Sequence, residues 1–212
     1  MIIHDIEQRT EEWHQLRAGM PTASMFSKLV TSTGTASKSM PDYALKLAGA
    51  VYAGKDLDAW EGNKWTERGT ELEDAARSLY EFANDVQIEQ VGFITDDEQK
   101  YGCSPDGLVG DDGMVEFKCL KAENHIKAIM GYQKNGACPS TYIQQVQGQM
   151  LVTGRGWCDL VFYHPELPLL TIRRVFDTEM WRAIEKQITA VLEKRDAIVV
   201  TLNKQSNTGG EQ

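Results

Sequence analysis

The sequence predicts an α/β (α+β) fold in which a mixed central β-sheet is flanked by helices. Two observations lead to this prediction. The expected elements come in the order helices, a central group of strands, helices, two strands and a closing helix. The segment Asp111-Asp112-Gly113 predicts a hairpin turn that joins two of the central strands. The length of 212 residues and the apolar content of 42% suit one domain with a real core.

Local signals place each element. Helices are expected where apolar residues recur every three to four positions, and strands where they alternate. A short helix containing Trp13 and Leu16 is expected to end at Gly19, a common residue just after a helix. The small polar segment 31–39 predicts a mobile loop. The expected helices are 42–53, 66–83, 122–132, 139–152 and 178–195, and the expected strands are 88–94, 100–104, 107–109, 114–119, 157–164 and 169–175.

Composition narrows the class of protein. A net charge of −9 and a pI near 5.0 argue against a general coat protein of nucleic acid, which would be basic. The four cysteines show no C-x-x-C spacing, so no zinc site is expected, and the thiols are expected to be reduced and intracellular. We see no signal peptide and no apolar run long enough for a membrane span. The tail from Asn203 is expected to fray, leaving residues 1–202 as a single domain and 203–212 as a flexible tail.

The most informative pattern is an acid after a proline, followed by an acid and a lysine two positions apart. Asp106 lies in Ser-Pro-Asp-Gly, and Glu116 and Lys118 lie on the next strand, where alternation points both to the same face. Two carboxylates and an ammonium suit hydrolysis of a phosphodiester, because Mg²⁺ prefers hard oxygen ligands. We expect Asp106, Glu116 and the backbone carbonyl of Phe117 to bind the metal, and Lys118 to orient or help deprotonate the attacking water.

The same residues also have ordinary structural interpretations. Ser-Pro-Asp-Gly suits a type I turn, and a strand with Glu116 and Lys118 on one side suits a half-exposed strand. The pattern alone leaves both interpretations open.

Two helices offer further polar candidates. Glu73 lies beside an apolar stripe, where it is expected to reach a cleft and help bind a second metal ion; the alternative is a surface pair with Arg77, worth about 0.2–0.5 kcal/mol. Gln145 and Gln149 share a face of a later helix, but spacing alone favours a solvated polar face. The apolar stripe beside Glu73 comprises Leu72, Ala75, Ala76, Leu79 and Phe82.

The N-terminal third contains a candidate anion site. Thr22 or Ser24 is expected to cap a helix, and a helix N-terminus near Arg17 suits an anion, although a plain cap and an exposed arginine explain the same pattern. Trp60 and Trp65 are interpreted as packing or interface residues in preference to a wedge that opens a duplex end.

Taken together, five ordered strings resemble the lambda exonuclease family, the YqaJ-type viral recombinases among the PD-(D/E)xK nucleases. The resemblance extends roughly from Arg9 to the strands after Trp157, and it implies a restriction-endonuclease-like mixed central β-sheet in a single nuclease domain. The strings are Trp13-xxx-Arg17-x-Gly19-xx-Thr22-Ala-Ser24, Gly69-xxx-Glu73-xxx-Arg77, Cys103-Ser-Pro-Asp106-Gly, Glu116-x-Lys118-Cys119 and Gln145-Val-Gln147.

The resemblance implies a role for each matching residue of the catalytic centre. Asp106, Glu116 and the carbonyl of Phe117 are similar to the family's metal ligands, and Lys118 is similar to its catalytic lysine. Glu73 is similar to the helix carboxylate that supports a second metal ion.

Other matching residues resemble groups that surround this centre. Gln145 is similar to a glutamine beside the catalytic centre, and Arg17, Ser24 and Ser104 resemble the pocket that holds the 5′-phosphate of a DNA end. One departure affects that pocket, because the family prototype has an arginine shortly after its catalytic lysine. The aligned position here is near Asn124, with Lys121 and Lys127 as candidate substitutes.

By this resemblance, we expect a Mg²⁺-dependent exonuclease with two ions, Mn²⁺ being an alternative. It would digest one strand of duplex DNA in the 5′→3′ direction from a 5′ end, preferably phosphorylated, and leave a 3′ overhang. The resemblance also implies a ring-shaped homotrimer, a single-strand annealing protein as partner in recombination, a phage or prophage origin and the cytoplasm of a bacterial host. Five bases of the first third are expected to line the DNA path: Arg9, Arg17, Lys28, Lys38 and Lys46.

Two other functions remain as alternatives. One is an endonuclease or junction resolvase of the same superfamily. The other is a catalytically silent DNA-end-binding protein, against which the joint presence of Asp106, Glu116 and Lys118 argues.

Overall fold

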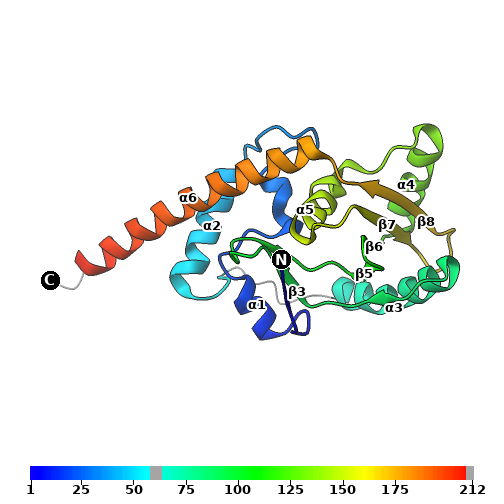
Figure 1. Cartoon of the computed structure of the whole chain (residues 1–212), viewed down its shortest axis with the longest axis horizontal. Coiled ribbons are helices and arrows are strands. Elements are labelled where there is room, and N and C mark those ends of the chain that lie inside the picture. Colours follow the sequence, from blue (N-terminus) through cyan, green and yellow to red (C-terminus); the bar gives the residue numbers. More distant parts are fainter. Residues whose placement is uncertain (58–63, 209–212) are drawn as a thin grey trace.

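Two β-sheets form the centre of the computed structural model, and helices pack around them (Figure 1). The structure describes the backbone of residues 1–57 and 64–208 and the side chains of residues 1–57 and 72–206. Neighbouring strands are antiparallel except for the pair β6 and β7, so the larger sheet is mixed, as predicted. Its order is β2 (Ile88–Glu89), β5 (Gly107–Val109), β6 (Gly113–Cys119), β7 (Trp157–Tyr163) and β8 (Leu170–Val175). The smaller sheet has the order β1 (Ile2–His4), β3 (Phe93–Thr95) and β4 (Gly102–Cys103).

The helices begin and end at the expected kinds of residue. Pro41 lies in the first turn of α2, and Gly54 ends that helix in the left-handed conformation, with a φ of 68°. None of the described helices combines the length and the apolar character that a membrane span requires. The α-helices are α1 (Glu11–Arg17), α2 (Met40–Ala53), α3 (Lys64–Asn84), α4 (Ala122–Asn135), α5 (Ile143–Thr153) and α6 (Thr178–Thr208), with short 3₁₀ helices η1 (Ala23–Lys28) and η2 (Ser140–Tyr142).

The two faces of strand β6 contribute to different cores. Val115 and Phe117 pack toward α3, in a cluster with Ala76 and Tyr80, and Cys119 contacts the same cluster. The other face of the sheet packs against α5, where Met114, Leu160 and Phe162 meet Val146 and Met150. Because side chains alternate along a strand, Glu116 and Lys118 project to the α5 side. The predicted alternation is therefore confirmed, but helices cover both faces.

The predicted strand 88–94 is two strands. β2 pairs with β5 in the larger sheet, while β3 pairs with β1 and β4 in the smaller one. Gly92 lies at the crossing, where a Cβ atom would come within 1.7 Å of the carbonyl oxygen of Ile6. Strand β1 was not predicted, because its three residues are too few to show a period.

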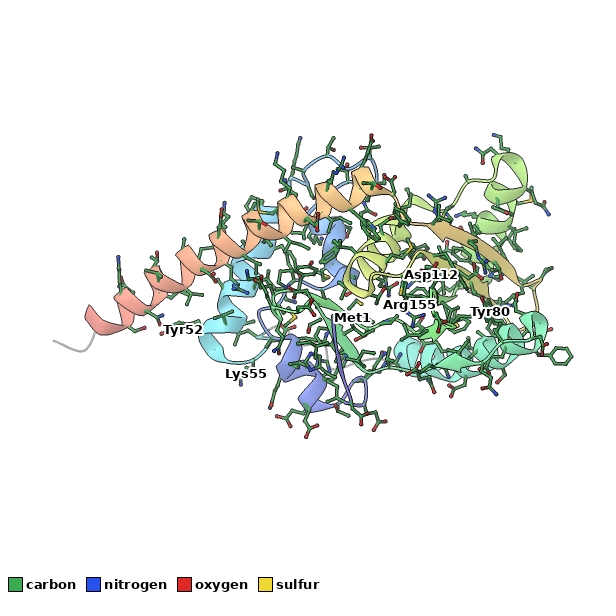
Figure 2. The ribbon with its side chains drawn as sticks, in the orientation of Figure 1. Met1, Tyr52, Lys55, Tyr80, Asp112 and Arg155 are labelled. Carbon is green, nitrogen blue, oxygen red and sulfur yellow. The ribbon has the colours of Figure 1, made fainter. Side chains whose placement is uncertain are left out.

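The apolar stripe predicted for α3 packs only in part. Ala76 and Tyr80 are buried, whereas Leu79 is 41% exposed and Phe82 is 88% exposed. The helix is rotated because Tyr80 places its hydroxyl on the buried carboxylate of Asp159, with an oxygen–oxygen distance of 2.6 Å. Figure 2 labels Tyr80 on α3. Trp60, and the side chain of Trp65, fall outside the residues that the structure describes.

Two further segments show structure that the sequence did not predict. Segment 31–39 forms a hydrogen-bonded turn, in which the hydroxyls of Thr31 and Thr35 lie 2.7 Å apart. Helix α6 continues to Thr208, well beyond its predicted end at residue 195, and projects from the body beside α2 (Figure 1). A hydrogen bond between the hydroxyls of Tyr52 and Ser206 joins the two helices near their ends. Contact with α2 thus accounts for the continuation of α6 into a polar sequence.

Candidate active site

The carboxylate of Glu116 is the centre of the predicted site, and it is buried. The residue is only 3% exposed, yet three side-chain donors reach it. The Lys118 ammonium and the Gln145 amide donate to Oε1, each at 2.6 Å, and the Gln149 amide donates to Oε2 at 2.7 Å. A buried carboxylate is costly unless it is hydrogen-bonded, so strand β6 and helix α5 provide its environment together.

The glutamines of α5 correct one sequence prediction. A solvated polar face was preferred for Gln145 and Gln149, but Gln149 is 1% exposed and Gln145 is half-buried. The helix lies across the sheet with this face turned inward. Elsewhere on α5, Gly148 permits close packing against η1, since a Cβ atom at this position would come within 2.3 Å of the Phe26 ring. Gln149 was therefore missed as a site residue, and its spacing of four from Gln145 was the available signal.

Asp106 lies beside Glu116, as predicted. β5 and β6 pair with Gly107 opposite Val115, and the carboxylate of Asp106 accepts the backbone N–H of Phe117 at 2.6 Å. Burial, followed by the negative charge of Glu116, raises the pKa of Asp106 well above its ordinary value. The carboxyl groups of Asp106 and Glu116 thus lie close together, with too little positive charge nearby to balance both.

Lys118 is an ammonium in this environment. Burial by itself would lower the pKa of Lys118, but the charges of Glu116 and Asp106 outweigh burial and raise it. The ammonium also donates to Oε1 of Gln145 at 3.2 Å and lies 5.1 Å from the centre of the Tyr142 ring. In its protonated state Lys118 donates hydrogen bonds and places a positive charge in the site, but it cannot accept a proton.

Glu73 reaches the same region from α3. It lies on the packing face, three residues before Ala76, and accepts a hydrogen bond from Arg9 Nη2 at 2.9 Å. The alternative pair with Arg77 does not form, because Arg77 binds Asp74 instead, at 2.7 Å. A cavity of about 660 Å³ is lined by Arg9, Glu73 and Asp106.

Asp106 and Glu116 are the candidate ligands of a divalent cation. Among the residues that the structure describes, no group of three or more His, Cys, Asp or Glu side chains gathers closely enough to hold a metal ion. Asp106 and Glu116 supply two hard oxygen ligands, and the electrostatic penalty on Asp106 is one that a cation would relieve. Mg²⁺ commonly takes one or two carboxylates and retains water, so this sparse set fits it.

Arg17 lies in a second pocket. Its guanidinium stacks on the Trp13 indole, 3.8 Å from the ring centre, and both side chains donate to the Ser104 hydroxyl, at 3.3 Å from Arg17 and 2.9 Å from Trp13. Burial lowers the pKa of Arg17 to about 10, so the group remains charged at neutral pH. A cavity of about 230 Å³ is lined by Arg17 and Ser24.

The predicted helix cap is not formed. Thr22 precedes η1, but its side chain makes no capping hydrogen bond. Its hydroxyl lies 3.3 Å from the hydroxyl of Ser24, and its backbone N–H donates to the Tyr43 hydroxyl at 3.3 Å. These hydroxyls line the pocket.

The candidate substitutes for the missing arginine lie elsewhere. Asn124 and Lys127 line a third cavity, of about 470 Å³, with Tyr142. Lys127 is exposed and pairs with Glu123 on its own helix. Of the five bases expected along a DNA path, Arg9 lines the cavity of about 660 Å³, and Arg17 and Lys46 line the Arg17 pocket. Lys28 and Lys38 are exposed.

Comparison with known proteins decides the family. Residues 12–156 match the YqaJ-like viral recombinase domain. This range includes the principal side chains of both pockets, from Trp13 to Gln149. The chain belongs to this family. The resemblance seen in the sequence is thereby confirmed, and the YqaJ-like chain is a nuclease. No curated protein matches it.

Solved structures agree with this assignment. The YqaJ-like chain is similar to an alkaline exonuclease, LHK-Exo, from Laribacter hongkongensis, with 34% identity, a TM-score of 0.81 and coverage of 94% of this chain and 99% of that one. A structure of LHK-Exo in complex with dAMP matches with 33% identity, the same TM-score of 0.81 and the same coverage of 94% and 99%. A phage-related exonuclease from Haemophilus somnus 129PT shares the fold, with 16% identity, a TM-score of 0.68 and coverage of 86% and 96%.

Proposed function

We propose that this YqaJ-like nuclease is a Mg²⁺-dependent exonuclease that digests one strand of duplex DNA in the 5′→3′ direction. It prefers a phosphorylated 5′ end, releases mononucleotides and leaves a 3′ overhang. The observation that carries the proposal is the connection between the two pockets. Ser104, which holds Arg17 and Trp13, lies two residues before the catalytic Asp106 on one continuous segment.

This connection supports both the polarity and the product. Two residues of extended chain span at most about 7 Å. A terminal phosphate bound at Arg17 and Ser104 therefore leaves the next phosphodiester of that strand within reach of Asp106 and Glu116. Repeated binding of the new 5′ end releases one nucleotide at each cut.

The residues of the site have distinct roles in this proposal. Asp106, Glu116 and the carbonyl of Phe117 hold Mg²⁺, with Mn²⁺ as an alternative. When bound, the ion would act as a Lewis acid on the phosphodiester and lower the pKa of a bound water. Lys118 stabilises the negative charge that develops on the phosphate, and Gln145 keeps Lys118 and Glu116 in place through two hydrogen bonds, of 3.2 and 2.6 Å.

A second ion is the less direct part of the proposal. Glu73 is its proposed ligand, and this carboxylate is bound to Arg9 at 2.9 Å. Both side chains are partly exposed, at 24% for Glu73 and 45% for Arg9, and exposed pairs contribute only about 0–1 kcal/mol. Release of Arg9 toward the DNA backbone would therefore free Glu73 at little cost.

We further propose that the protein acts as a ring-shaped homotrimer, with residues 1–202 as its single nuclease domain and 203–212 as a tail. The exposed apolar side chains Leu79 and Phe82 on α3, and Ile126 and Met130 on α4, support association with other copies. The 3′ overhang would be passed to a single-strand annealing protein for recombination, in the cytoplasm of a bacterial host that carries the phage or prophage.

Digestion of linear duplex with one labelled strand tests this function. Four reactions combine a 5′-phosphate or 5′-hydroxyl end with the presence or absence of Mg²⁺. We expect the 5′-labelled strand to yield labelled mononucleotide first, with Mg²⁺ and faster from phosphorylated ends. Loss from the 3′ end, or digestion in the presence of EDTA, would contradict the proposal. Covalently closed circular duplex separates the alternative, since only an endonuclease or resolvase cuts it.

A further inference from the structure

The Arg17 pocket contains a second cation that the predicted 5′-phosphate site did not include. Lys46, on α2, lines the same cavity of about 230 Å³ as Arg17 and Ser24. Of the substitutes considered from the sequence, Lys127 lines a different cavity, and Lys121 is not among the residues that line this one. Arg17 and Lys46 therefore give the pocket two positive charges from different elements.

An internal anion faces these cations. Asp56 lines the cavity, and its carboxylate lies 3.7 Å from the Lys46 ammonium. Its charge also acts on Arg17 and on Tyr43, whose pKa values are set mainly by burial and modified by Asp56. The negative charge of Asp56 thus acts on several groups of the Arg17 pocket, and not on Lys46 alone.

The pair between Lys46 and Asp56 is a loose one. Its distance exceeds the 2.7–2.9 Å of a good charge-assisted hydrogen bond, and the side chains are 38% and 33% exposed. Such a pair is easily exchanged for a better partner. A terminal phosphate carries about −1.5 to −2 charges at neutral pH, more than one carboxylate, and offers three acceptor oxygens.

The remaining lining can donate to those oxygens. Tyr43 Oη accepts the Thr22 N–H at 3.3 Å, and burial raises the pKa of Tyr43 to about 12, so its proton is retained and can be donated. The hydroxyls of Thr22 and Ser24 are 3.3 Å apart and can each rotate toward a ligand.

We propose that Lys46 is a specificity-determining residue that binds the terminal 5′-phosphate, and that Asp56 is the internal anion which the phosphate displaces. This inference rests on the proposed function of the Arg17 pocket. In this arrangement Lys46 leaves Asp56 and contacts the phosphate opposite Arg17. Asp56 competes with the phosphate for Lys46, so loss of the Asp56 charge strengthens binding of phosphorylated ends.

The test compares cleavage rates of 5′-phosphate and 5′-hydroxyl duplexes. Lys46→Ala is expected to lower kcat/KM about tenfold on phosphorylated ends, the scale of one charged hydrogen bond, and less than twofold on hydroxyl ends. Asp56→Asn is expected to lower KM for phosphorylated ends by about two- to fivefold, since it removes the competing charge. Lys46→Arg keeps the charge and should retain the preference. Lys55→Ala, at the exposed lysine labelled at the end of α2 in Figure 2, is the matched control.

A binding measurement without cleavage gives an independent readout. Fluorescence anisotropy of the two labelled duplexes in EDTA should show the same order of variants for phosphorylated ends. An equal loss on both kinds of end in Lys46→Ala, or a weaker phosphate preference in Asp56→Asn, would overturn the inference while the proposed function stands. A native protein that digests both ends equally would overturn the phosphate pocket and this inference together, and absence of 5′→3′ digestion would remove the function itself.

Discussion

Replacement of Gln149 by methionine tests whether the buried carboxylate of Glu116 is stabilised by α5. The Gln149 amide donates to Glu116 Oε2 at 2.7 Å, and both residues are nearly inaccessible, at 1% and 3% exposed. Methionine keeps the length of the side chain but cannot donate. The change therefore removes one of three donors without opening a large cavity.

The expected loss follows from two opposing effects. A hydrogen bond to a charged group contributes about 1.5–3 kcal/mol, and this amount is lost. Gln149 Oε1 is buried without a hydrogen-bond partner, so its removal returns about 1 kcal/mol. The free energy of unfolding should fall by about 0.5–2 kcal/mol, which for this chain length lowers Tm by about 1–8 °C.

Gln144 provides a matched control on the same helix. It is also buried, and its Oε1 also lacks a partner, but its amide donates to the neutral carbonyl of Val30 at 3.3 Å. Gln144→Met should therefore cost about 1 kcal/mol less than Gln149→Met. The measurement is urea denaturation in EDTA, so that metal binding does not mask the effect. Equal stability of the two variants would refute the assigned role of the charged acceptor.

Three other changes have defined outcomes. Lys118→Ala should abolish DNA cleavage yet leave end binding largely intact, as measured by digestion and anisotropy, and surviving cleavage would contradict its role. Tyr80→Phe should lower the free energy of unfolding by about 2 kcal/mol at pH 7, because it removes the hydrogen bond to Asp159. Burial and that bond raise the pKa of Tyr80, so its contribution is complete below the unfolded-state value of about 10 and declines above it; a pH series of denaturation curves should show this decline only in the native protein. Arg9→Gly should change stability by less than about 1 kcal/mol in the same assay, because relief of a φ of 72° offsets the exposed pair with Glu73, and a loss above 2 kcal/mol would disprove this balance.

The hairpin of the active site was predictable because its signals are local. The alternation of apolar residues defines strands β5 and β6 and places Glu116 and Lys118 on one face. The turn between the strands is residues 110–112, one position earlier than the predicted Asp-Asp-Gly turn. Asp106 follows from the same hairpin, since antiparallel pairing brings its segment opposite Glu116. The five motif strings also identified the family, which the comparisons confirmed.

The side chains that complete the site depend on which surfaces meet. Helical spacing placed Leu79 and Phe82 on one stripe of α3 with Ala76. The sheet instead accepts Ala76 together with Tyr80, which turns Glu73 toward Arg9. A helical period cannot distinguish two adjacent stripes of similar polarity.

The same limitation applies to α5 and to the Arg17 pocket. Gln149 looks like a solvated residue until the buried carboxylate of Glu116 is placed opposite it. Lys46 and Arg17 are 29 positions apart in the sequence, and only the packing of α1, η1 and α2 brings them to one cavity. Local chain geometry thus specifies the acids and the lysine, whereas long-range packing selects the partners that set their charge and orientation.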